Sequence, residues 1–239
     1  MVLGSNHELC PVEENVLQLR QAYCKLLLKH RPGTVLDVGC GGGQVMQMLA
    51  EQGVHCTGVE NGPPSENLNG FEFVQASAEA LPFAADSFDW VSMRHIPHHL
   101  AQPQRALAEA IRIARHGLLI AEPIFDRNHP AQALAEDVDL WLKRQHRREG
   151  RVHNPNLSLQ QIRALMQPLG AAVSLWEHFP PSGNRDGSNL IAEINNYSAQ
   201  LPSTRSDVSA GQDLIQRIQE TPVSWNGSLC VIAERLSSD

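Results

Sequence analysis

The chain has 239 residues, of which 42% are hydrophobic and 19% charged, and its net charge is -7. This length and composition predict a single globular domain over 1–239 with a full hydrophobic core. The acidic balance argues against nucleic acid or an anionic membrane as a partner, and no apolar stretch approaches membrane-spanning length.

The cysteines and the first residues predict a cytoplasmic protein. Five cysteines are present, an odd number with no CxxC pair, which favours reduced thiols over a disulfide framework or a zinc knuckle. The start, MVLGSNHELC, lacks a basic segment followed by an apolar core, as a secretory signal would have.

Helices and strands alternate through the first half of the chain. In order, the patterns predict a helix over 12–30, a strand over 34–38, a helix over 44–52, strands over 54–59, 71–74 and 88–93, a helix over 104–115 and a strand over 117–121. Only turn-forming residues separate the strands at 54–59 and 71–74, so no helix is expected between them. This alternation predicts a parallel sheet covered by helices on both faces.

The pattern changes beyond residue 123. A long, charged, helical segment at 128–157 precedes a helix at 159–169, and two further strands are expected at 172–176 and 229–233. The polar run at 180–227 holds one predicted helix, 212–220. We therefore expect a core over 12–123 and two insertions, 128–157 and 180–227, that border an acceptor site.

The first strand runs into a glycine loop, VLDVGCGGG at 35–43. No Lys-Ser or Lys-Thr follows these glycines, which excludes a P-loop. The dinucleotide fingerprint G-x-G-x-x-G fails because its third glycine is replaced by Gln44. Asp37 would also repel a pyrophosphate. An acid beside the turn instead favours a ligand with a cationic group, such as the amino group of an amino-acid moiety.

Three features together resemble a known family. They are the glycine loop, Glu60 at the end of the second strand, and SAEALPFAADSFDWV at 77–91. They are similar to the class I S-adenosylmethionine-dependent methyltransferases, and most to the small-molecule group with the ubiquinone and menaquinone methyltransferases. The resemblance covers residues 12–123 well and the last two strands loosely.

The resemblance implies both a fold and an activity. The fold would be α/β, a Rossmann-like seven-stranded methyltransferase sheet with helices on both faces and lid insertions after strand five and between strands six and seven. The activity would be methyl transfer from S-adenosyl-L-methionine to a small-molecule acceptor, releasing S-adenosylhomocysteine. The acceptor atom stays open among O, N, C and S, and no oligomeric state is indicated.

The resemblance also implies cofactor contacts at the strand ends. Glycines in the loop let the backbone approach the cofactor, some at positive φ. Asp37 would act on the ligand's ammonium, and Glu60 would accept hydrogen bonds from the ribose hydroxyls. The full expected set is Asp37, Gly39, Cys40 (by its backbone, not as a nucleophile), Gly41, Gly43, Glu60, Asn61, Ser77, Ala78, Glu79 and Arg94.

Two of these positions carry open alternatives. The family often has an acid where Ser77 stands, so the contact to the adenine amino group is left to Ser77, Ala78 or Glu79. Arg94 would touch either the methionine end of the cofactor or an anionic acceptor.

The sequence MRHIPHHL follows the fourth strand, where ligands of such sheets bind. We expect His95 or His99 to act as a base or to orient the acceptor, the alternatives being helix capping and pocket lining. The spacing of His95 with His98 or His99 would also suit a metal ion, but no cysteine or acid nearby completes a ligand set, so no metal is expected.

Other residues and other functions remain as alternatives. The following side chains of the insertions either line the acceptor pocket or, as the alternative favoured for most of them, are ordinary packing or surface residues: Trp141, His146, His153, Trp176, His178, Arg185 and Trp225. A cofactor-binding regulator without turnover, a nucleic-acid methyltransferase and an NAD-dependent oxidoreductase are the competing functions. The acidic balance and the lack of an Asn-Pro-Pro-Tyr-type motif oppose the nucleic-acid enzyme.

Overall fold

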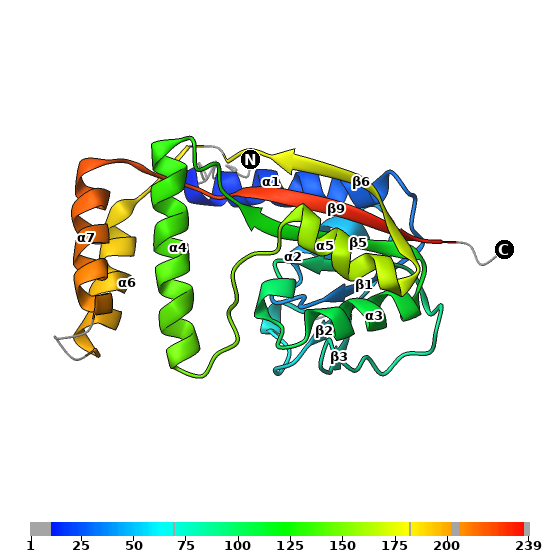
Figure 1. The fold of residues 1–239 in the computed structure, drawn as a ribbon. Helices are drawn as coiled ribbons and strands as arrows, with labels where there is room; N and C mark the ends of the chain where they lie inside the picture. Colours follow the sequence, from blue (N-terminus) through cyan, green and yellow to red (C-terminus); the bar gives the residue numbers. More distant parts are fainter. Residues whose placement is uncertain (1–10, 69, 182, 202–205, 237–239) are drawn as a thin grey trace, which may run out of the picture.

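A computed structural model of the chain describes all residues except 1–10, 69, 182, 202–205 and 237–239. Cys10 and the rest of the first ten residues therefore lie outside the described residues. A seven-stranded sheet with the order β3-β2-β1-β4-β5-β9-β6 forms the centre of the molecule (Figure 1). Its strands are β1 Thr34–Val38, β2 His55–Glu60, β3 Glu72–Gln75, β4 Phe88–Arg94, β5 Ala114–Ile124, β6 Ala171–Phe179 and β9 Gly227–Arg235.

Seven α-helices accompany this sheet in the described residues. They are α1 Pro11–Leu28, α2 Gln44–Ala50, α3 Pro103–Ile113, α4 Pro130–Arg148, α5 Leu159–Met166, α6 Gly187–Ala199 and α7 Ser206–Glu220. The short elements are the 3-10 turns η1 Glu66–Leu68, η2 Pro97–His99 and η3 Gln167–Leu169, and the paired strands β7 Asn184–Arg185 and β8 Val223–Ser224. Within the described residues, no helix is both long and apolar enough to cross a membrane.

The expected parallel sheet holds for its first five strands only. β3, β2, β1, β4 and β5 are parallel neighbours, whereas β9 lies antiparallel between β5 and β6. The last strand of the chain thus enters the sheet between two strands that precede it. All five parallel strands place their carboxyl ends at one edge of the sheet, where ligands of such sheets bind.

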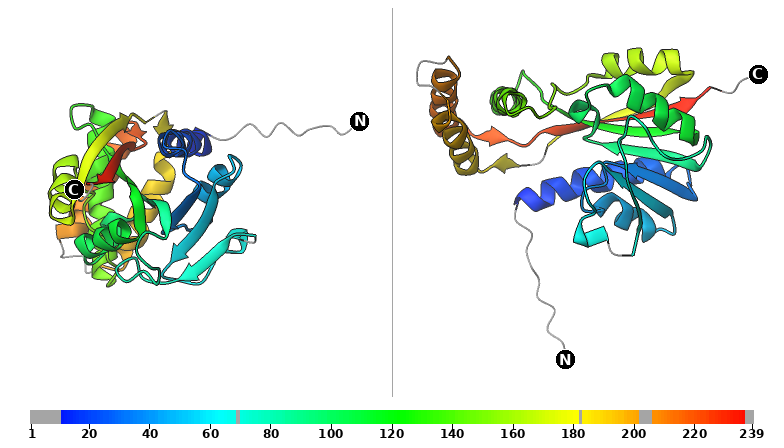
Figure 2. Two further views of the ribbon diagram at one scale, coloured as in Figure 1. Left: turned by 90° about the vertical axis from the view of Figure 1, so that its right-hand side faces the viewer. Right: turned by 90° about the horizontal axis from the view of Figure 1, so that it is seen from below.

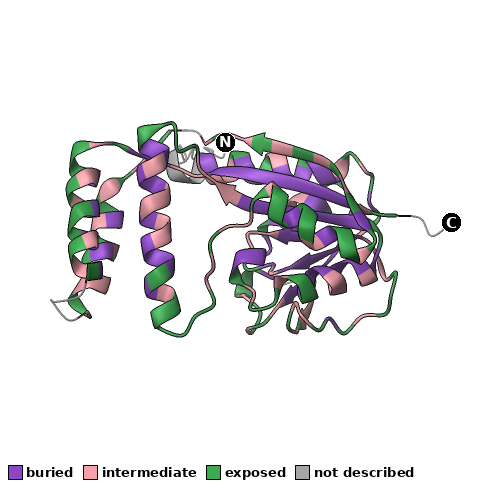
Figure 3. Ribbon diagram, viewed as in Figure 1, coloured by how far each residue is buried: buried purple, intermediate pink, exposed green. Residues whose placement is uncertain are grey.

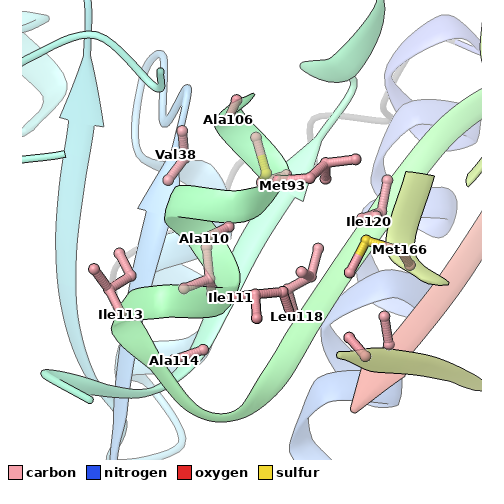
Figure 4. Close-up of a cluster of buried hydrophobic side chains, with 14 of the residues drawn as sticks. Val38, Met93, Ala106, Ala110, Ile111, Ile113, Ala114, Leu118, Ile120 and Met166 are labelled. Carbon is pink, nitrogen blue, oxygen red and sulfur yellow. The ribbon is translucent and has the colours of Figure 1, made fainter. Parts of the chain in front are cut away.

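Each face of the sheet has its own core. On one face α3 packs on β4 and β5, with Ala110 and Ile111 of α3 against Leu118 of β5, and α5 packs on β6 and β9 (Figure 4). On the other face α1 and α2 pack through a cluster that includes Leu27 and Met46. The apolar stripes read from the sequence therefore face the sheet, as expected for helices that cover both of its faces.

The structure differs from the sequence-based expectation at the end of α3 and within the second insertion. The helix expected over 104–115 ends at Ile113, because the chain is already extended from Ala114 and pairs with β4 there. The polar run at 180–227 holds two helices instead of one, since α6 was missed and α7 begins before 212. Between β2 and β3 the described residues form only the turn η1, which agrees with the expectation of no α-helix there.

The two expected insertions pack against each other. Figures 1 and 2 show α4, α6 and α7 together at one end of the sheet. Their shared core includes Leu134 and Trp141 of α4, Leu190 and Ile194 of α6, and Leu214 of α7. Figure 3 shows buried positions along α4, which faces the other two helices. We call this three-helix layer the helical unit.

Candidate functional site

The glycine loop leaves β1 in a conformation that favours glycine. Gly39, Gly41 and Gly43 have φ values of 73°, 52° and 76°. A Cβ on Gly39 would overlap the Ile96 side chain, so the loop passes directly against the segment that follows β4. A Cβ on Gly41 would meet nothing within 4 Å, which leaves that part of the loop open. The positive φ values expected from the sequence are therefore confirmed.

Cys40 turns away from the open side of this loop. Its thiol is 6% exposed and lies toward Gly58 and the Met46 side chain in the core. Burial raises the pKa of Cys40 to about 12, with the nearby carboxylates of Asp37 and Glu60 adding to the shift. The thiol is thus protonated and inaccessible, and only the backbone of Cys40 faces the loop.

Asp37 is a buried carboxyl at the end of β1, 3% exposed. Ser92 on the neighbouring strand β4 donates a hydrogen bond to Asp37 Oδ1 over 2.7 Å. The Tyr23 hydroxyl of α1 lies 3.0 Å from Ser92 Oγ and donates to the Leu119 carbonyl over 2.9 Å, which fixes the serine from behind. The position of the carboxyl is therefore set by three elements.

Burial also controls the charge of Asp37. It raises the pKa of Asp37 to about 6, an effect that Glu60 reinforces and that Ser92 and the Arg94 guanidinium oppose. Burial lowers the pKa of Arg94, yet an arginine stays cationic at any physiological pH. The carboxyl of Asp37 is thus largely removed from water. A further positive charge beside it would stabilise its ionised form.

Glu60 joins the end of β2 to the glycine loop. Its Oε2 accepts a hydrogen bond from the Gly41 N–H over 3.1 Å, and its Oε1 accepts one from the Asn61 N–H over 3.3 Å. A cavity of about 280 Å³ opens beside it at the carboxyl edge of the sheet. Its lining comprises Val38, Gly39, Val59, Glu60, Asn61, Ala76, Ser77, Ala78, Glu79, Ile96, His99, Leu100, Ala101 and Val152.

The residues after β3 that line this cavity differ in the hydrogen bonds that their side chains already make. The Glu79 carboxylate accepts the Gln102 N–H over 2.9 Å at the start of α3, so it is already engaged by the fold. Ser77 Oγ accepts the Glu79 N–H over 3.2 Å. Of the three alternatives for the adenine contact, Ser77 and Ala78 are therefore better placed than the carboxylate of Glu79.

His95 occupies an unusual position directly after β4. Its φ of 58° lies in the left-handed region, and its N–H donates to the Ala121 carbonyl over 2.8 Å. Among the described residues, nothing hydrogen-bonds its buried Nε2. Burial, followed by the charge of Arg94, lowers the pKa of His95 well below its ordinary value. The ring is thus neutral, with a free nitrogen, on a strained backbone of the kind found at functional sites.

The structure adds His98 and Glu122, two residues that the sequence analysis did not assign to the site. His98 is 4% exposed, and its Nδ1 lies 3.0 and 3.1 Å from the two carboxylate oxygens of Glu122, which is fully buried in β5. The signal available in the sequence was an acid inside the apolar run GLLIAEP. Its partner was hidden because it lies 24 positions away.

His153 comes next to these residues from the segment that connects α4 and α5. Its Nδ1 lies 2.6 Å from Nδ1 of His146, and its ring centroid is 4.3 Å from that of His99. Burial and the neighbouring His99 and Lys143 lower the pKa of His153 to about 3. Both His146 and His153, expected in the acceptor pocket, thus lie in a histidine cluster instead.

Comparison with known proteins finds similarity to methyltransferases. The family described as "Methyltransferase domain" matches residues 36–121. A ubiquinone biosynthesis O-methyltransferase of Hahella chejuensis is 32% identical over 133 residues, covering 51% of this chain and 52% of that protein. An uncharacterized methyltransferase of Mycolicibacterium gilvum is 38% identical over 91 residues, covering 35% of this chain and 36% of that protein.

A solved structure shares the fold over most of the chain. It is the Burkholderia thailandensis 1,6-didemethyltoxoflavin-N1-methyltransferase with bound 1,6-didemethyltoxoflavin and S-adenosylhomocysteine. The TM-score is 0.54 at 16% identity, over 94% of this chain and 82% of that chain. Residues 36–121 thus match a methyltransferase domain family, and the fold of the chain is similar to that of a solved methyltransferase. The curated relatives above, however, are matched over only 36% to 52% of their own length.

The chain has a second, larger cavity of about 950 Å³ where the helical unit meets the sheet. Ile124, Phe125 and Leu159 supply apolar wall, and Gln132 and His178 supply polar groups. Gln132 Nε2 donates to Ser224 Oγ over 2.6 Å, which joins the start of α4 to β8.

The other insertion side chains expected at an acceptor site have different surroundings. Trp141 is buried inside the helical unit, and its Nε1 donates to the Asp207 carbonyl over 3.1 Å. Trp176 is 42% exposed on β6. The Arg185 guanidinium lies 5.0 Å from the ring centroid of Trp225. Of that set, His178 is the residue that lines the larger cavity.

Proposed function

We propose that this chain binds S-adenosyl-L-methionine in the smaller cavity and transfers its methyl group to a small-molecule acceptor held in the larger one. The observation that carries the proposal is the lining of the smaller cavity. Gly39 follows β1, Glu60 ends β2 and Ser77 follows β3, and the three line this cavity at the carboxyl edge of the sheet. This is where the family resemblance requires the ribose and adenine contacts.

The chemistry of the ligand matches the charges around it. Glu60, at the end of β2, is placed to accept hydrogen bonds from ribose hydroxyls and would repel a 2'-phosphate. Burial raises the pKa of Asp37 and so disfavours its carboxylate form. The ammonium of the cofactor's methionine part would stabilise that carboxylate. Arg94, across the sheet from Asp37, would pair with the cofactor's carboxylate or with an anionic acceptor.

A small acceptor is supported by the relatives and by the larger cavity. The two relatives named for a reaction are an O-methyltransferase of ubiquinone biosynthesis and an N1-methyltransferase of a didemethyltoxoflavin. The wall formed by Ile124, Phe125 and Leu159 suits an acceptor with apolar surface, and the polar groups of Gln132 and His178 would orient it.

The protein's part in the reaction is alignment and removal of a proton. A methyl group on a sulfonium is already activated, so holding acceptor and cofactor in line and excluding water supply most of the acceleration. His95 and His99 are the groups we assign to the acceptor, with His95 favoured as base by its free, neutral Nε2. His95 does not line either of the two cavities described, so this role requires the acceptor to reach past Ile96.

Binding and turnover test the proposal separately. Calorimetry with S-adenosylmethionine should show one site per chain, which Asp37→Ala removes. Incubation with a metabolite extract and methyl-labelled cofactor should then give a labelled small molecule and an equal amount of S-adenosylhomocysteine. Asp37→Ala protein with the same extract is the matched control.

Each alternative function predicts a different result. Cofactor binding without acceptor-dependent S-adenosylhomocysteine would indicate a regulator instead of an enzyme. Label in the RNA or DNA fraction, with salt-sensitive binding, would indicate a nucleic-acid methyltransferase. Binding of NAD in preference to S-adenosylmethionine would overturn the cofactor assignment.

A further inference from the structure

We propose that His98, His99 and His153 form a binding site for a divalent transition metal ion of the zinc class, with Glu122 holding His98 in place. Each of the three histidines offers a ring nitrogen, and these three atoms all lie within 4.8 Å of one another. Ligand nitrogens of a tetrahedral zinc ion lie roughly 3.3 Å apart, given Zn–N bonds of about 2.0–2.1 Å. The site therefore needs to contract by at most roughly 1.5 Å. His99 is exposed, so rotation of its side chain can provide this contraction.

The second nitrogen of each ring is held by the protein. His98 Nδ1 donates to Glu122, because a carboxylate can only accept, and this leaves Nε2 of His98 with its lone pair. The backbone of Val152 hydrogen-bonds the His99 ring. Metal-bound histidines nearly always have their other nitrogen fixed in this way by a carboxylate or a backbone carbonyl.

His153 completes the pattern through its contact with His146. The two Nδ1 atoms lie 2.6 Å apart, and in the tautomer in which His153 Nδ1–H donates to His146 Nδ1, Nε2 of His153 keeps its lone pair for an ion. The segment that carries His153 is tied to the loop after β4, since the Asn154 N–H donates to the His98 carbonyl over 2.7 Å. Asn154 Nδ2 also donates to the Leu100 carbonyl over 3.0 Å. The ligands thus come from two segments that are hydrogen-bonded to each other.

The local charges suit a cation despite a buried lysine nearby. Lys143 is 1% exposed, but its ammonium forms an ion pair of 2.8 Å with Asp139 and donates to Asn156 Oδ1 over 2.5 Å. With that pair neutral overall, the carboxylate of Glu122 is a fully buried negative charge in contact with His98. The cation of Arg147, which donates to the His153 carbonyl over 2.5 Å, is exposed to solvent and screened by it. A dication would balance the charge of Glu122 in a desolvated place.

The position of the cluster suggests what the ion does. His99 lines the smaller cavity, whereas Ile124 and Leu229, the neighbours of Glu122 along and across the sheet, line the larger one. With three nitrogens bound, one position of a tetrahedral ion stays open for an acceptor hydroxyl or thiol, whose proton it would release to solvent. The resulting anion would take the methyl from the sulfonium and release S-adenosylhomocysteine. This role rests on the proposed function, whereas metal binding itself does not.

The test measures metal binding by untagged full-length protein that has first been stripped with a chelator. Calorimetric titration with Zn²⁺, without S-adenosylmethionine, should show one ion per chain. His153→Ala and His99→Ala should each weaken binding at least about 100-fold. Glu122→Gln should weaken it about 10- to 100-fold, as loss of an outer carboxylate does. His55→Ala, which removes an exposed histidine on β2, is the matched control and should bind like the unaltered chain.

Two further readouts keep the test decisive. Co²⁺ in place of Zn²⁺ should give the intense visible absorption of a four-coordinate ion, and His99→Ala should abolish it without changing the far-UV circular dichroism. Zinc binding that is absent, or equal in the unaltered chain and the His99→Ala variant, would overturn the proposal and assign the histidines to packing. Zinc binding without methyl transfer would contradict the proposed function alone.

Discussion

Replacing Asp37 by asparagine should stabilise the cofactor-free protein and weaken its binding of S-adenosylmethionine. Burial raises the pKa of Asp37 from its ordinary 3.8 to about 6. A folded-state pKa above the unfolded one means that the side chain is neutral and without penalty below pH about 4. The penalty then grows as the pH rises through 6, and two pKa units correspond to about 3 kcal/mol.

About 3 kcal/mol is the upper limit of the increase in the free energy of unfolding that Asp37→Asn can give. Asparagine keeps an oxygen that can accept from Ser92, but its two N–H groups need acceptors that the carboxylate did not need. For a chain of this size, the limit corresponds to a rise in Tm of roughly 6–12 °C. Urea unfolding of both proteins should show a difference in free energy near zero at pH 4 and largest at pH 8.

Cofactor binding should change in the opposite direction. In the proposed complex the ammonium of S-adenosylmethionine pairs with the Asp37 carboxylate, so the affinity of the unaltered protein should fall below pH 6, by up to about tenfold per pH unit. The variant should bind weakly at every pH. Asp89→Asn is a control in which the change in stability should have the opposite sign. Burial of Asp89 is outweighed by hydrogen bonds from Arg115, Thr34 and Gly33, which lower its pKa, so its loss should destabilise the protein at neutral pH. A stability difference that does not vary with pH, together with unchanged affinity in calorimetry, would refute the reasoning for Asp37.

Three other substitutions, one of them with a glycine control, probe the cofactor loop and the acceptor side. Glu60→Gln should weaken S-adenosylmethionine binding about 10- to 100-fold in calorimetry, because it loses a charged acceptor for the ribose hydroxyls; equal affinity would remove Glu60 from the site. Gly39→Ala should lower the free energy of unfolding by about 2–4 kcal/mol, since it combines strain at positive φ with overlap on Ile96. Gly53→Ala, at φ 82° in open space, should lose only about 1 kcal/mol. His95→Asn, which tolerates the left-handed backbone, should slow turnover at least about 100-fold with little change in cofactor affinity, and full activity would exclude His95 as base.

The part of the fold that sequence reasoning predicted well is the part with strong periodicity. The strands β1 to β5 and the helices α1 to α3 appear within a few residues of their expected bounds, because apolar runs and glycine turns mark them locally. The helix α6 was missed because its sequence, GSNLIAEINNYSA, is rich in polar residues that are neutral or poor helix formers. It is helical because Leu190 and Ile194 pack against α4 and α7.

The place of β9 could not be predicted from local pattern either. An apolar strand of buried residues reads the same whether its neighbours are parallel or antiparallel. Its pairing with β5 and β6 is decided by the helical unit, which carries the chain back so that β9 runs opposite to both.

The cofactor contacts and the histidine cluster also differ in how far the sequence could predict them. The expected cofactor contacts from Asp37 to Glu79 follow strand ends, and the family resemblance implies them; they stay predictions. The histidine cluster instead joins the loop after β4, the end of β5 and the segment between α4 and α5. The sequence argument against a metal considered only neighbours along the chain, whereas Glu122 and His153 arrive from 24 and more positions away. In the proposed site the acceptor meets residues beyond 121, such as Ile124, Gln132 and His153. The family match over 36–121 therefore informs the cofactor side of the proposal and says little about the acceptor.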